Sequence, residues 1–468
     1  MKKLFIFLLI LTSFKVFSQK IFSIKECVEY SIQNNIQIKQ STLNSELNAN
    51  SLNQNKNNRY PNLSGNASYG YNWGKAVDAF TNELNTERVM SQNFSLSSSV
   101  ILFNGLKLVN NIKKSNYDLL TTKEETEKLK YELTLSVASA YLQILYNEEN
   151  KNISIKNLEN IKQKKEKISK QIEVGKLPKN EIFTIDAEIA NAELELINAE
   201  SNIELAYLNL KILMNYNETE NFVIQKVNIN IPIDNIKTTT DAIYEISISN
   251  HPAIKAGESK LNSTITAIEI AKSEYYPSLS LRGSVGTGYS SASKIVENAY
   301  YSGENLIGYT ESKENVYSPN YNYDYKTKSY TKQLDNNINT SLGFYLSIPI
   351  FDGFKVKSNV ERYKIDKKNA ELSLLNSKDN IKKEILQAYT DMTVARKKLD
   401  ASLKSYNASK ESYNVINQKY ENGVIGFYEF NDANLKLVKA ESELLKAKYD
   451  LMFKHKIIQY YTGQPFDL

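Results

Sequence analysis

The sequence carries one long pattern twice, and this duplication constrains the fold more than any other feature. Tyr-Pro opens a segment of alternating polarity at Pro61 and again at Pro277, 216 residues later. Phe-Asn-Gly or Phe-Asp-Gly closes the segment at Gly105 and at Gly353, 248 residues later. The second copy therefore has 32 more residues in this segment (248 − 216). A repeat of this length indicates duplication of one large unit, not a solenoid.

The first 18 residues have the composition of a secretory signal peptide. Two lysines precede an apolar run from Leu4 to Leu11, and Ser18 ends a segment with small or aliphatic side chains at the cleavage positions. A membrane-anchor helix is the alternative, but the run is shorter than the roughly 20 apolar residues that cross a bilayer. We predict a mature chain that begins at Gln19 and leaves the cytoplasm.

Composition disfavours several classes of protein. The formal charge of +5 falls to +2 without the three lysines of the signal peptide, which is too little to favour nucleic acid. Two histidines, five methionines and one cysteine give little material for a transition-metal site, and we predict no metal and no cofactor. Cys27 has no partner for an intrachain disulfide and no lipidation signal before it. We expect it to be buried near the start of a helix.

Four segments alternate between apolar and small polar side chains, two in each copy. They are residues 61–74, 93–103, 277–290 and 338–351. In the first, Leu63, Ala67 and Tyr69 share one face, and Asn, Ser and Gly fill the other. This period of two is typical of strands with lipid on one face and water on the other. A soluble sandwich is the alternative, but four matched strands behind a signal peptide favour a membrane barrel.

Four strands cannot close a barrel, because about eight is the smallest number that does, and lipid does not tolerate open sheet edges. The chain must therefore oligomerise. Two chains would give a barrel filled by side chains, whereas three would give twelve strands and a lumen. Between the strands, residues 75–92 and 291–337 are polar, and we expect loops there.

The other segments predict helices too long for a globular domain. Residues 24–58 have the pattern of one helix, which Pro61 ends. No proline or glycine occurs between Gly105 and Val174, so a helix of up to about 70 residues, roughly 105 Å, is allowed.

Each long helix has a return partner with a heptad seam. Large and small apolar residues alternate in both copies, at Ile189, Ala192, Leu196, Ala199 and Ile203 and at Leu437, Ala440, Leu444, Ala447 and Leu451. Such a seam lets backbones approach closely at alanine. A two-stranded coiled coil is the alternative, but recurrence beside a long partner and two strands favours a closed ring of paired helices.

These patterns divide the chain into four parts. We predict a signal peptide at 1–18, a first structural repeat at 19–214, an inter-repeat segment at 215–240 and a second repeat at 241–468. The inter-repeat segment is irregular, with strand-like runs at 222–224 and 231–233, and we expect a belt outside the helices.

In order and in doubling, these motifs resemble the TolC-type outer-membrane efflux family over nearly the whole mature chain. The turns at Gly175 and Gly423 and the Thr-Gly pair that ends at Gly463 also match. The resemblance implies an α+β membrane protein. Three chains would close a 12-stranded β-barrel in the outer membrane, continued by an α-helical barrel in the periplasm. The implied role is the exit duct of a tripartite efflux or type I secretion system, with a periplasmic adaptor (membrane fusion) protein and an inner-membrane pump as partners.

The resemblance also implies a periplasmic gate. Family members place a tyrosine three residues before the glycine of the second turn and acidic residues six and nine after it, which here are Tyr420, Glu429 and Asp432. The acidic residue six after the glycine of the first turn is Glu181. Because residues three apart share a helix face, a trimer would carry two stacked rings of carboxylates.

One position of the gate departs from the family pattern. Where the family has an arginine two residues after the second glycine, this chain has Ile425. A lock between that arginine and an acid is therefore in doubt. Lys176 or Lys179 is the candidate substitute, and solvated lysines at a turn are the alternative.

The two turns also predict docking tips for the adaptor. Gly175 and Gly423 allow a positive φ, and Leu177, Val424 and Ile425 beside them are apolar at an end that should be exposed. Burial against the neighbouring hairpin is the alternative.

An enzyme finds little support in the sequence. Glu429 and Asp432 could form a catalytic pair, but no histidine, metal cluster or phosphate loop accompanies them, and we predict no enzymatic activity. The alternative function is a structural or glycan-binding surface protein with a helical rod. The transported substrate and the class of pump stay open.

Overall fold

The computed structural model describes residues 21–82, 84–86, 88–216, 222–227, 239–464 and 466. The predicted signal peptide and the strand-like run at 231–233 lie outside these residues. The chain divides into two compact units, and each unit combines residues from both copies of the repeat. The helical unit comprises Met1–Ala49, Asn116–Ser263 and Lys367–Leu468, and the strand unit comprises Asn50–Ser115 and Thr264–Asp366.

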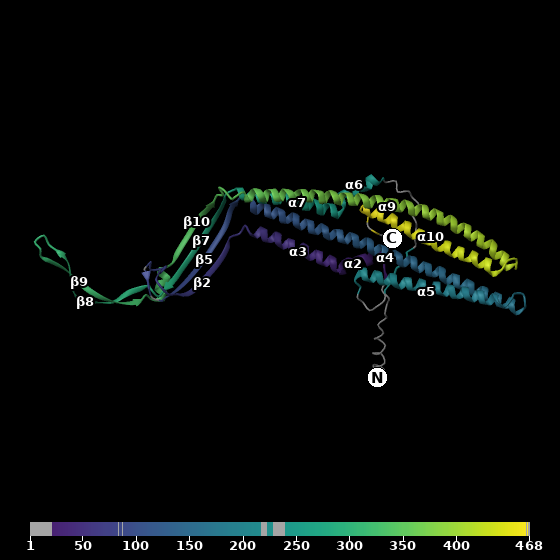
Figure 1. Ribbon diagram of the computed structural model, residues 1–468, viewed down its shortest axis with the longest axis horizontal. Helices are drawn as coiled ribbons and strands as arrows, with labels where there is room; N and C mark the ends of the chain where they lie inside the picture. The colour runs from purple at the N-terminus through teal and green to yellow at the C-terminus, as the bar shows by residue number, and fades with distance from the viewer. Residues whose placement is uncertain are drawn as a thin grey trace, which may run out of the picture. The chain divides into compact units, whose positions relative to one another are not determined.

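The strand unit contains a four-stranded antiparallel sheet. Its strands are β2 (Asn62–Asn72), β5 (Val89–Asn104), β7 (Ser278–Ser290) and β10 (Asn339–Ser347). Their order across the sheet is β10, β7, β5, β2, so each copy supplies one central and one edge strand (Figure 1). The two edge strands are the ones that neighbouring chains must cover in a closed barrel.

The strand register gives this sheet one polar and one apolar face, as the alternation predicts. Ser97 pairs with Ser64 on one side and Ser284 on the other, and Ser284 pairs with Ser341. The hydroxyls of Ser64 and Ser97 lie 2.9 Å apart, and those of Ser284 and Ser341 lie 2.8 Å apart. In the adjacent row Leu96 pairs with Val285. One face is therefore polar across all four strands, and the other is apolar.

The prediction of a long loop at 291–337 is wrong. This segment forms a second antiparallel pair, β8 (Lys294–Tyr309) and β9 (Asn315–Thr327) (Figure 1). The short helix α8 (Tyr330–Asn336) follows it. Tyr321, Tyr323 and Tyr325 alternate along β9, with ring centroids 6.4 and 6.3 Å apart. Aromatic side chains at every second position favour a strand, and the abundance of Ser and Asn hid that period.

The loop predicted at 75–92 is also partly regular. It holds a pair of two-residue strands, β3 (Ala76–Val77) and β4 (Leu84–Asn85), and β5 has already begun at Val89.

The long helices form two hairpins, and most of their length belongs to the helical unit (Figure 1). The first joins α4 (Lys107–Glu173) to α5 (Glu181–Met214), and the second joins α9 (Lys355–Glu421) to α10 (Phe427–Tyr461). Helices α4 and α9 have 67 residues each, close to the upper length that the sequence allows. Across the described residues, no helix combines the length and the apolar character needed to span a membrane.

The prediction of one helix over 24–58 fails at Asn35. This residue is extended (φ −63°, ψ 125°) and separates α2 (Ile24–Asn34) from α3 (Ile36–Asn57). Its side chain accepts a hydrogen bond from the backbone N–H of Ile38, as asparagine does at helix starts. In the second copy His251, 216 residues later, has the same backbone conformation between α6 (Thr240–Asn250) and α7 (Pro252–Lys272). The break is therefore part of the duplicated unit.

Next to this break, α2 and the two-residue strand pair β1 (Ile21–Phe22) and β6 (Val223–Ile224) share an aromatic core. Phe22 contacts Phe222 edge to face, with centroids 5.2 Å apart. Cys27 is fully buried in this cluster, as the sequence predicts. Burial raises the pKa of the Cys27 thiol to about 12, with a smaller contribution from Glu26, so the thiol stays protonated.

Helix α5 is apolar on two opposite faces. Ala192, Ala199 and Ala206 lie on the face that packs inside the chain. At 100° per residue, a second apolar row lies on the far side of the helix. Its members have exposed fractions of 53–72% and are Phe183, Leu194, Ile197, Leu205, Leu208 and Ile212. A helix that is apolar on both sides needs a second packing partner.

Candidate functional site at the tips of the helix hairpins

Both hairpins turn with the same backbone motif. Gly175 has φ +74° and Gly423 has φ +70°, a conformation that favours glycine. In the first turn the N–H of Gly175 donates to Ile172 and that of Lys176 to Gln171. In the second turn Gly423 donates to Tyr420 and Val424 to Lys419, with the same spacing. Each turn is therefore a Schellman motif, which satisfies the last carbonyls of the long helix.

The two tips share one apolar cluster within the chain. Phe427 and Phe430 of α10 are buried together with residues of the first hairpin, such as Ile168 and Ile185. Tyr420 stacks on Phe430, with centroids 4.9 Å apart and ring planes 25° apart. The spacing of Phe427 and Phe430 places both rings on one side of the first turn of α10. The second tip is thus anchored on the first by aromatic packing.

A buried lysine joins the tips electrostatically. Lys164 of α4 pairs with Glu421 at the end of α9, and its Nζ donates to Asn417 at 2.8 Å. The same Nζ lies 4.5 Å from the ring centroid of Phe430 and 5.1 Å from that of Tyr420. Lys167 adds a second ion pair to Glu421 at 3.0 Å. Hydrogen bonds from Lys164 and then Lys167 hold the pKa of Glu421 below its ordinary value.

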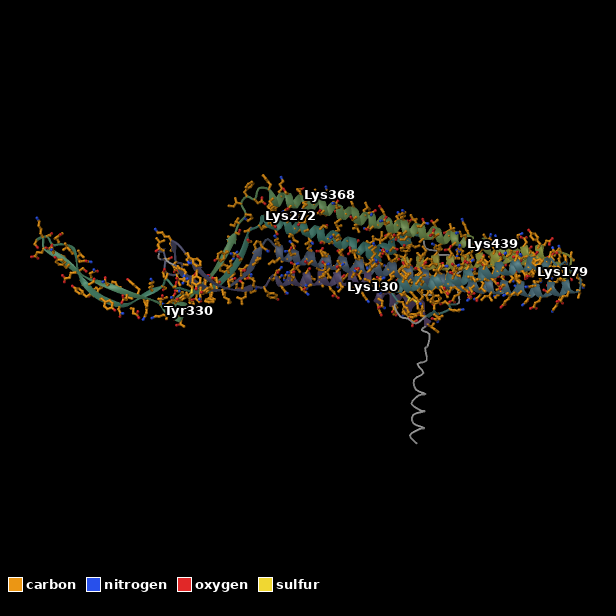
Figure 2. All side chains as sticks on the ribbon, turned by 60° about the horizontal axis from the view of Figure 1, so that its bottom comes forward. Lys130, Lys179, Lys272, Tyr330, Lys368 and Lys439 are labelled. Atoms are coloured by element: carbon orange, nitrogen blue, oxygen red, sulfur yellow. The ribbon has the colours of Figure 1, made fainter. Side chains whose placement is uncertain are left out.

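The second tip contains an ion pair although position 425 carries isoleucine. A basic partner is present, but it comes from the body of α4 and not from the turn. Lys176 and Lys179, the candidates from the sequence, are exposed, and Figure 2 shows Lys179 at the end of the first hairpin. Ile425 is half-buried. Lys164, Glu421 and the two phenylalanines therefore complete a site that the sequence motifs describe only in part.

Tyr420 occupies the inner side of the second tip. Its ring is half-buried, and burial followed by the charges of Glu421 and Glu181 raises its pKa to about 12. Glu181 of α5 thus influences Tyr420 within one chain. The phenol stays neutral at physiological pH and acts here through its ring.

Glu429 and Asp432 lie on the opposite, exposed face of α10. The carboxylate of Glu429 is at the N-terminus of the helix, because a Cβ added to Gly426 would lie 3.3 Å from its Oε2. The helix dipole favours negative charge there. Asp432 pairs with Lys436 at 2.6 Å in an exposed i,i+4 contact. Part of its charge is therefore already balanced.

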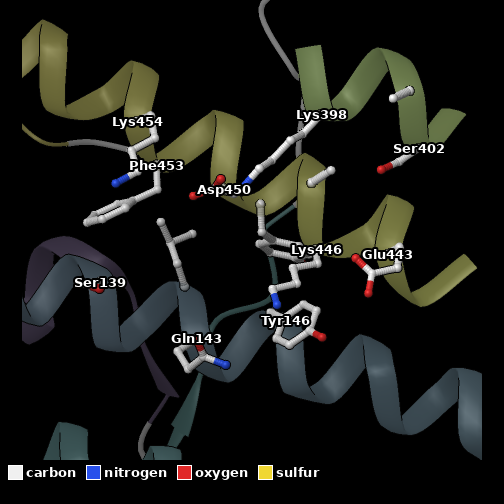
Figure 3. A pocket seen from close by; sticks show the side chains of 14 residues that line it. Ser139, Gln143, Tyr146, Lys398, Ser402, Glu443, Lys446, Asp450, Phe453 and Lys454 are labelled. Atoms are coloured by element: carbon white, nitrogen blue, oxygen red, sulfur yellow. The ribbon is translucent and has the colours of Figure 1, made fainter. Parts of the chain in front are cut away.

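The same face of α10 continues into a cleft of about 780 Å³ (Figure 3). From Asp432, steps of three or four residues lead through Lys436, Lys439, Glu443 and Lys446 to Asp450. Figure 3 shows Glu443, Lys446 and Asp450 at the cleft, beside side chains of α4 and α9. This face is charged along its length, as expected for a surface in contact with water.

The apolar residues at the turns differ in exposure. Val424 is 70% exposed, whereas Leu177 is half-buried against the shared cluster. Leu177 therefore packs inside the chain, as the alternative interpretation of these residues expects. Val424 is exposed and available to a partner.

Comparison with known proteins agrees with this architecture. The model of the outer membrane efflux protein family matches residues 28–215 and 243–454, one stretch in each copy. These stretches exceed half of the chain, and the protein belongs to this family. No curated protein matches the sequence.

Solved structures share the fold at low sequence identity. CusC has a TM-score of 0.75 and 16% identity over 94% of this chain and 92% of its own. The open-state MtrE channel of Neisseria gonorrhoeae has a TM-score of 0.71 and 18% identity over 95% of this chain and 89% of its own. The CmeC channel of Campylobacter jejuni has a TM-score of 0.68 and 17% identity over 94% of this chain and 85% of its own.

Family and fold together give the cellular place and the type of protein. It is an outer-membrane exit duct of the efflux type, with its helical part in the periplasm. Three chains share the 12-stranded barrel to which each contributes four strands. The family is one of channels and not of enzymes.

Proposed function

We propose that the hairpin tips are the periplasmic gate and the adaptor-docking surface of this exit duct. In this proposal the duct receives substrate from an inner-membrane pump through a periplasmic adaptor protein, in efflux or type I secretion. It passes the substrate outward without an enzymatic step. The observation that carries the gate is the exposed carboxylate face of α10 at the tip, directly opposite the aromatic anchor.

The gate has two layers in each chain. Glu429 and Asp432 face the lumen, and threefold repetition gives two rings of carboxylates that favour cations and attract multivalent ones. Tyr420, Lys164 and Glu421 lie behind them and hold the second hairpin on the first. Opening therefore requires the second tip to leave its aromatic and ionic contacts with α4, with Glu181 beside it on α5.

The two rings contribute unequally. Lys436 pairs with Asp432. Three copies of Lys436 beside the ring of Asp432 carboxylates therefore weaken the negative field of that ring. Glu429 makes no such ion pair among the described contacts and sits at the tip. Single-channel recording should show that Glu429→Gln reduces cation selectivity and block by divalent or trivalent cations more than Asp432→Asn does. Lys436→Gln is the matched opposite change and should increase both.

Variants of Tyr420 test the inner layer. Tyr420→Ala removes the stack on Phe430 and should raise the open probability strongly, whereas Tyr420→Phe keeps the ring and should change it less. If selectivity and cation block both survive the double neutralisation of Glu429 and Asp432, the carboxylates do not line the throat. Equal open probabilities for Tyr420→Ala and wild type would remove the aromatic anchor from the gate.

The docking part of the proposal rests on the exposed turns. Gly175 and Gly423 have open space around the position of a Cβ, and Val424 is exposed beside the second. Val424→Asp leaves the buried cluster intact and should reduce crosslinking to the adaptor and export in cells. Gly423→Trp adds bulk at the same turn and should act in the same direction, with Gly175→Trp as its counterpart. Unchanged crosslinking in all three variants would exclude the tips as the docking surface.

A further inference from the structure

A short segment between β2 and β5 is pinned to the sheet by a buried aspartate. We call Val77–Asn82 (residues 77–82) the mouth segment. Asp78 is 8% exposed, and its Oδ1 accepts hydrogen bonds from the backbone N–H of Phe80 at 3.0 Å and from the N–H and hydroxyl of Thr81 at 2.9 and 3.2 Å. Its Oδ2 accepts a 2.6 Å hydrogen bond from Oγ of Ser290, the last residue of β7. The carboxylate therefore shapes the segment and fixes it to a strand 212 residues away.

Burial acts to raise the pKa of Asp78, but the hydrogen bonds from Ser290, Thr81 and Phe80 outweigh it, and the pKa lies below its ordinary value. The carboxylate is thus ionised at neutral pH and accepts all four hydrogen bonds.

Phe80 lies directly on the backbone of β7. A Cβ added to Gly288 would be 2.1 Å from Cζ of Phe80 and 2.6 Å from the backbone oxygen of Gln92. A side chain at position 288 would clash with both the ring of Phe80 and the backbone of β5, so none fits there. Glycine at this strand position therefore allows the ring of Phe80 to pack directly on the strand, since glycines within strands often mark such a close approach.

The register shows on which face of the sheet the ring sits. Gly288 and Ser290 follow Ser284 by even numbers of residues, so all three share a face. Ser284 belongs to the polar row that crosses the sheet through Ser97 and Ser64. In outer-membrane barrels the polar face lines the interior, whereas the apolar face contacts lipid. The mouth segment thus lies on the lumen side.

The other face of β7 is covered separately at the same level. Tyr330 of α8 contacts Tyr289, with ring centroids 5.2 Å apart, and its hydroxyl lies 2.9 Å from Oε1 of Gln92. Gln333 accepts from the backbone N–H of Ser290 at 2.9 Å. The end of β7 is thus held between α8 and the mouth segment. Strand β5 leads into α4 at its other end, so this is the end of the sheet remote in sequence from the long helices.

We propose that the mouth segment forms an outer constriction of the duct, in which Phe80 of each of the three chains projects over the lumen face of β7. This constriction is separate from the periplasmic gate and stands on different residues. It would limit the size of molecules that pass the external opening. Asp78 and Gly288 are its positioning residues, since one pins the segment and the other makes room for the ring.

Cysteine labelling during single-channel recording tests this placement. Phe80→Cys and Tyr330→Cys occupy opposite faces of β7, and a polyethylene glycol maleimide added on the external side reacts with exposed thiols. The native Cys27 is buried and protonated, so the wild-type channel serves as the blank. We expect stepwise loss of current in Phe80→Cys, one step for each chain that reacts, and no loss in Tyr330→Cys.

A second labelling position and a variant that frees the mouth segment from β7 complete the test. Ala79→Cys retains the ring of Phe80 and should also lose current on labelling, while Asp78→Ala should raise the current before any label is added. The matched control for Asp78→Ala is Asp324→Ala on β9, which should leave the current unchanged. If Phe80→Cys and Ala79→Cys are shown by mass to be fully labelled and the current persists, or if neither reacts while Tyr330→Cys does, the mouth segment is not in the path.

Discussion

Helices α5 and α10 are equivalent members of the two copies, and they differ in the exposure of their second apolar row. Both bury a seam of alanines and larger apolar residues, which includes Ala192 in α5 and Ala440, 248 residues later, in α10. Opposite this seam α5 carries an exposed apolar row, with Leu205 60% exposed, whereas the equivalent row of α10, 248 positions later, is half-buried at Leu445, Phe453 and Tyr460.

This difference shows how one duplicated helix acquires two surroundings. The shared seam reflects the shared task of packing a return helix on its long partner. The second apolar row of α10 is half-covered within the chain, whereas that of α5 is exposed and needs a partner beyond the chain. We expect a neighbouring copy of the chain to be that partner. Duplication thus preserved the hairpin, while the surroundings of the second apolar row differ between the copies.

The largest expected effect is loss of the trimer when the apolar face of α5 is charged. Leu205→Glu places a carboxylate in a surface that should be buried between chains, and an unpaired buried charge is strongly unfavourable. We expect mass measurement in mild detergent to shift from trimer to monomer. Lys446→Glu changes an exposed charge of α10 that lies at the cleft, and it should leave the mass unchanged. A stable monomer of the wild-type protein with intact β-structure would refute the shared closure of the barrel.

The shared seam should respond alike in both copies. Ala192 and Ala440 are 4% and 6% exposed, so leucine at either position must overpack a close helix contact. We expect Ala192→Leu and Ala440→Leu each to cost about 1–3 kcal/mol of stability in thermal unfolding. Lys439→Leu, on the exposed face of α10, should stay within about 0.5 kcal/mol of wild type. Unchanged stability in either alanine variant would mean that the two seams are not equivalent.

Periodicity predicted most of the fold because it records burial. The alternation around Ser64 and Ser97 gave the two faces of the sheet, and the alanine seams gave the hairpins, since each pattern extends over many residues. Single residues that interrupt a pattern carry a weaker signal. Asn35 divides a predicted helix by capping the next one. Only the recurrence of the same backbone break at His251 shows that the break belongs to the duplicated unit.

The candidate site was predictable only as far as its motifs are local. Gly175 and Gly423 follow from turn chemistry, and both have the expected positive φ. Lys164 could not be found this way, because its partner Glu421 is 257 residues away and nothing near Lys164 marks it. The spacing of Phe427 and Phe430 was the available signal for an aromatic anchor at the second tip. The roles of Tyr420, Glu429 and Asp432 stay a prediction.

The smallest expected effect is a pH dependence at the ion pair between the hairpins. Lys164 and Lys167 lower the pKa of Glu421 in the folded protein, so the pair stabilises the tip above the ordinary carboxyl pKa of 4.5. This contribution is lost as the pH falls through the lowered pKa. Because the Glu421 side chain is 39% exposed, solvent screening should limit the effect to below about 1 kcal/mol.

Comparison of Glu421→Gln with wild type isolates this contribution from the other carboxylates. The difference in unfolding temperature should be largest at neutral pH and should vanish below the lowered pKa. Lys164 has a side chain only 10% exposed and Lys167 one 56% exposed, so Lys164→Gln should destabilise the protein more than Lys167→Gln at neutral pH. A difference that stays constant between neutral and acidic pH would show that Glu421 acts by its shape and not by its charge. In that case the aromatic stack of Tyr420 on Phe430 would be what holds the two hairpins together.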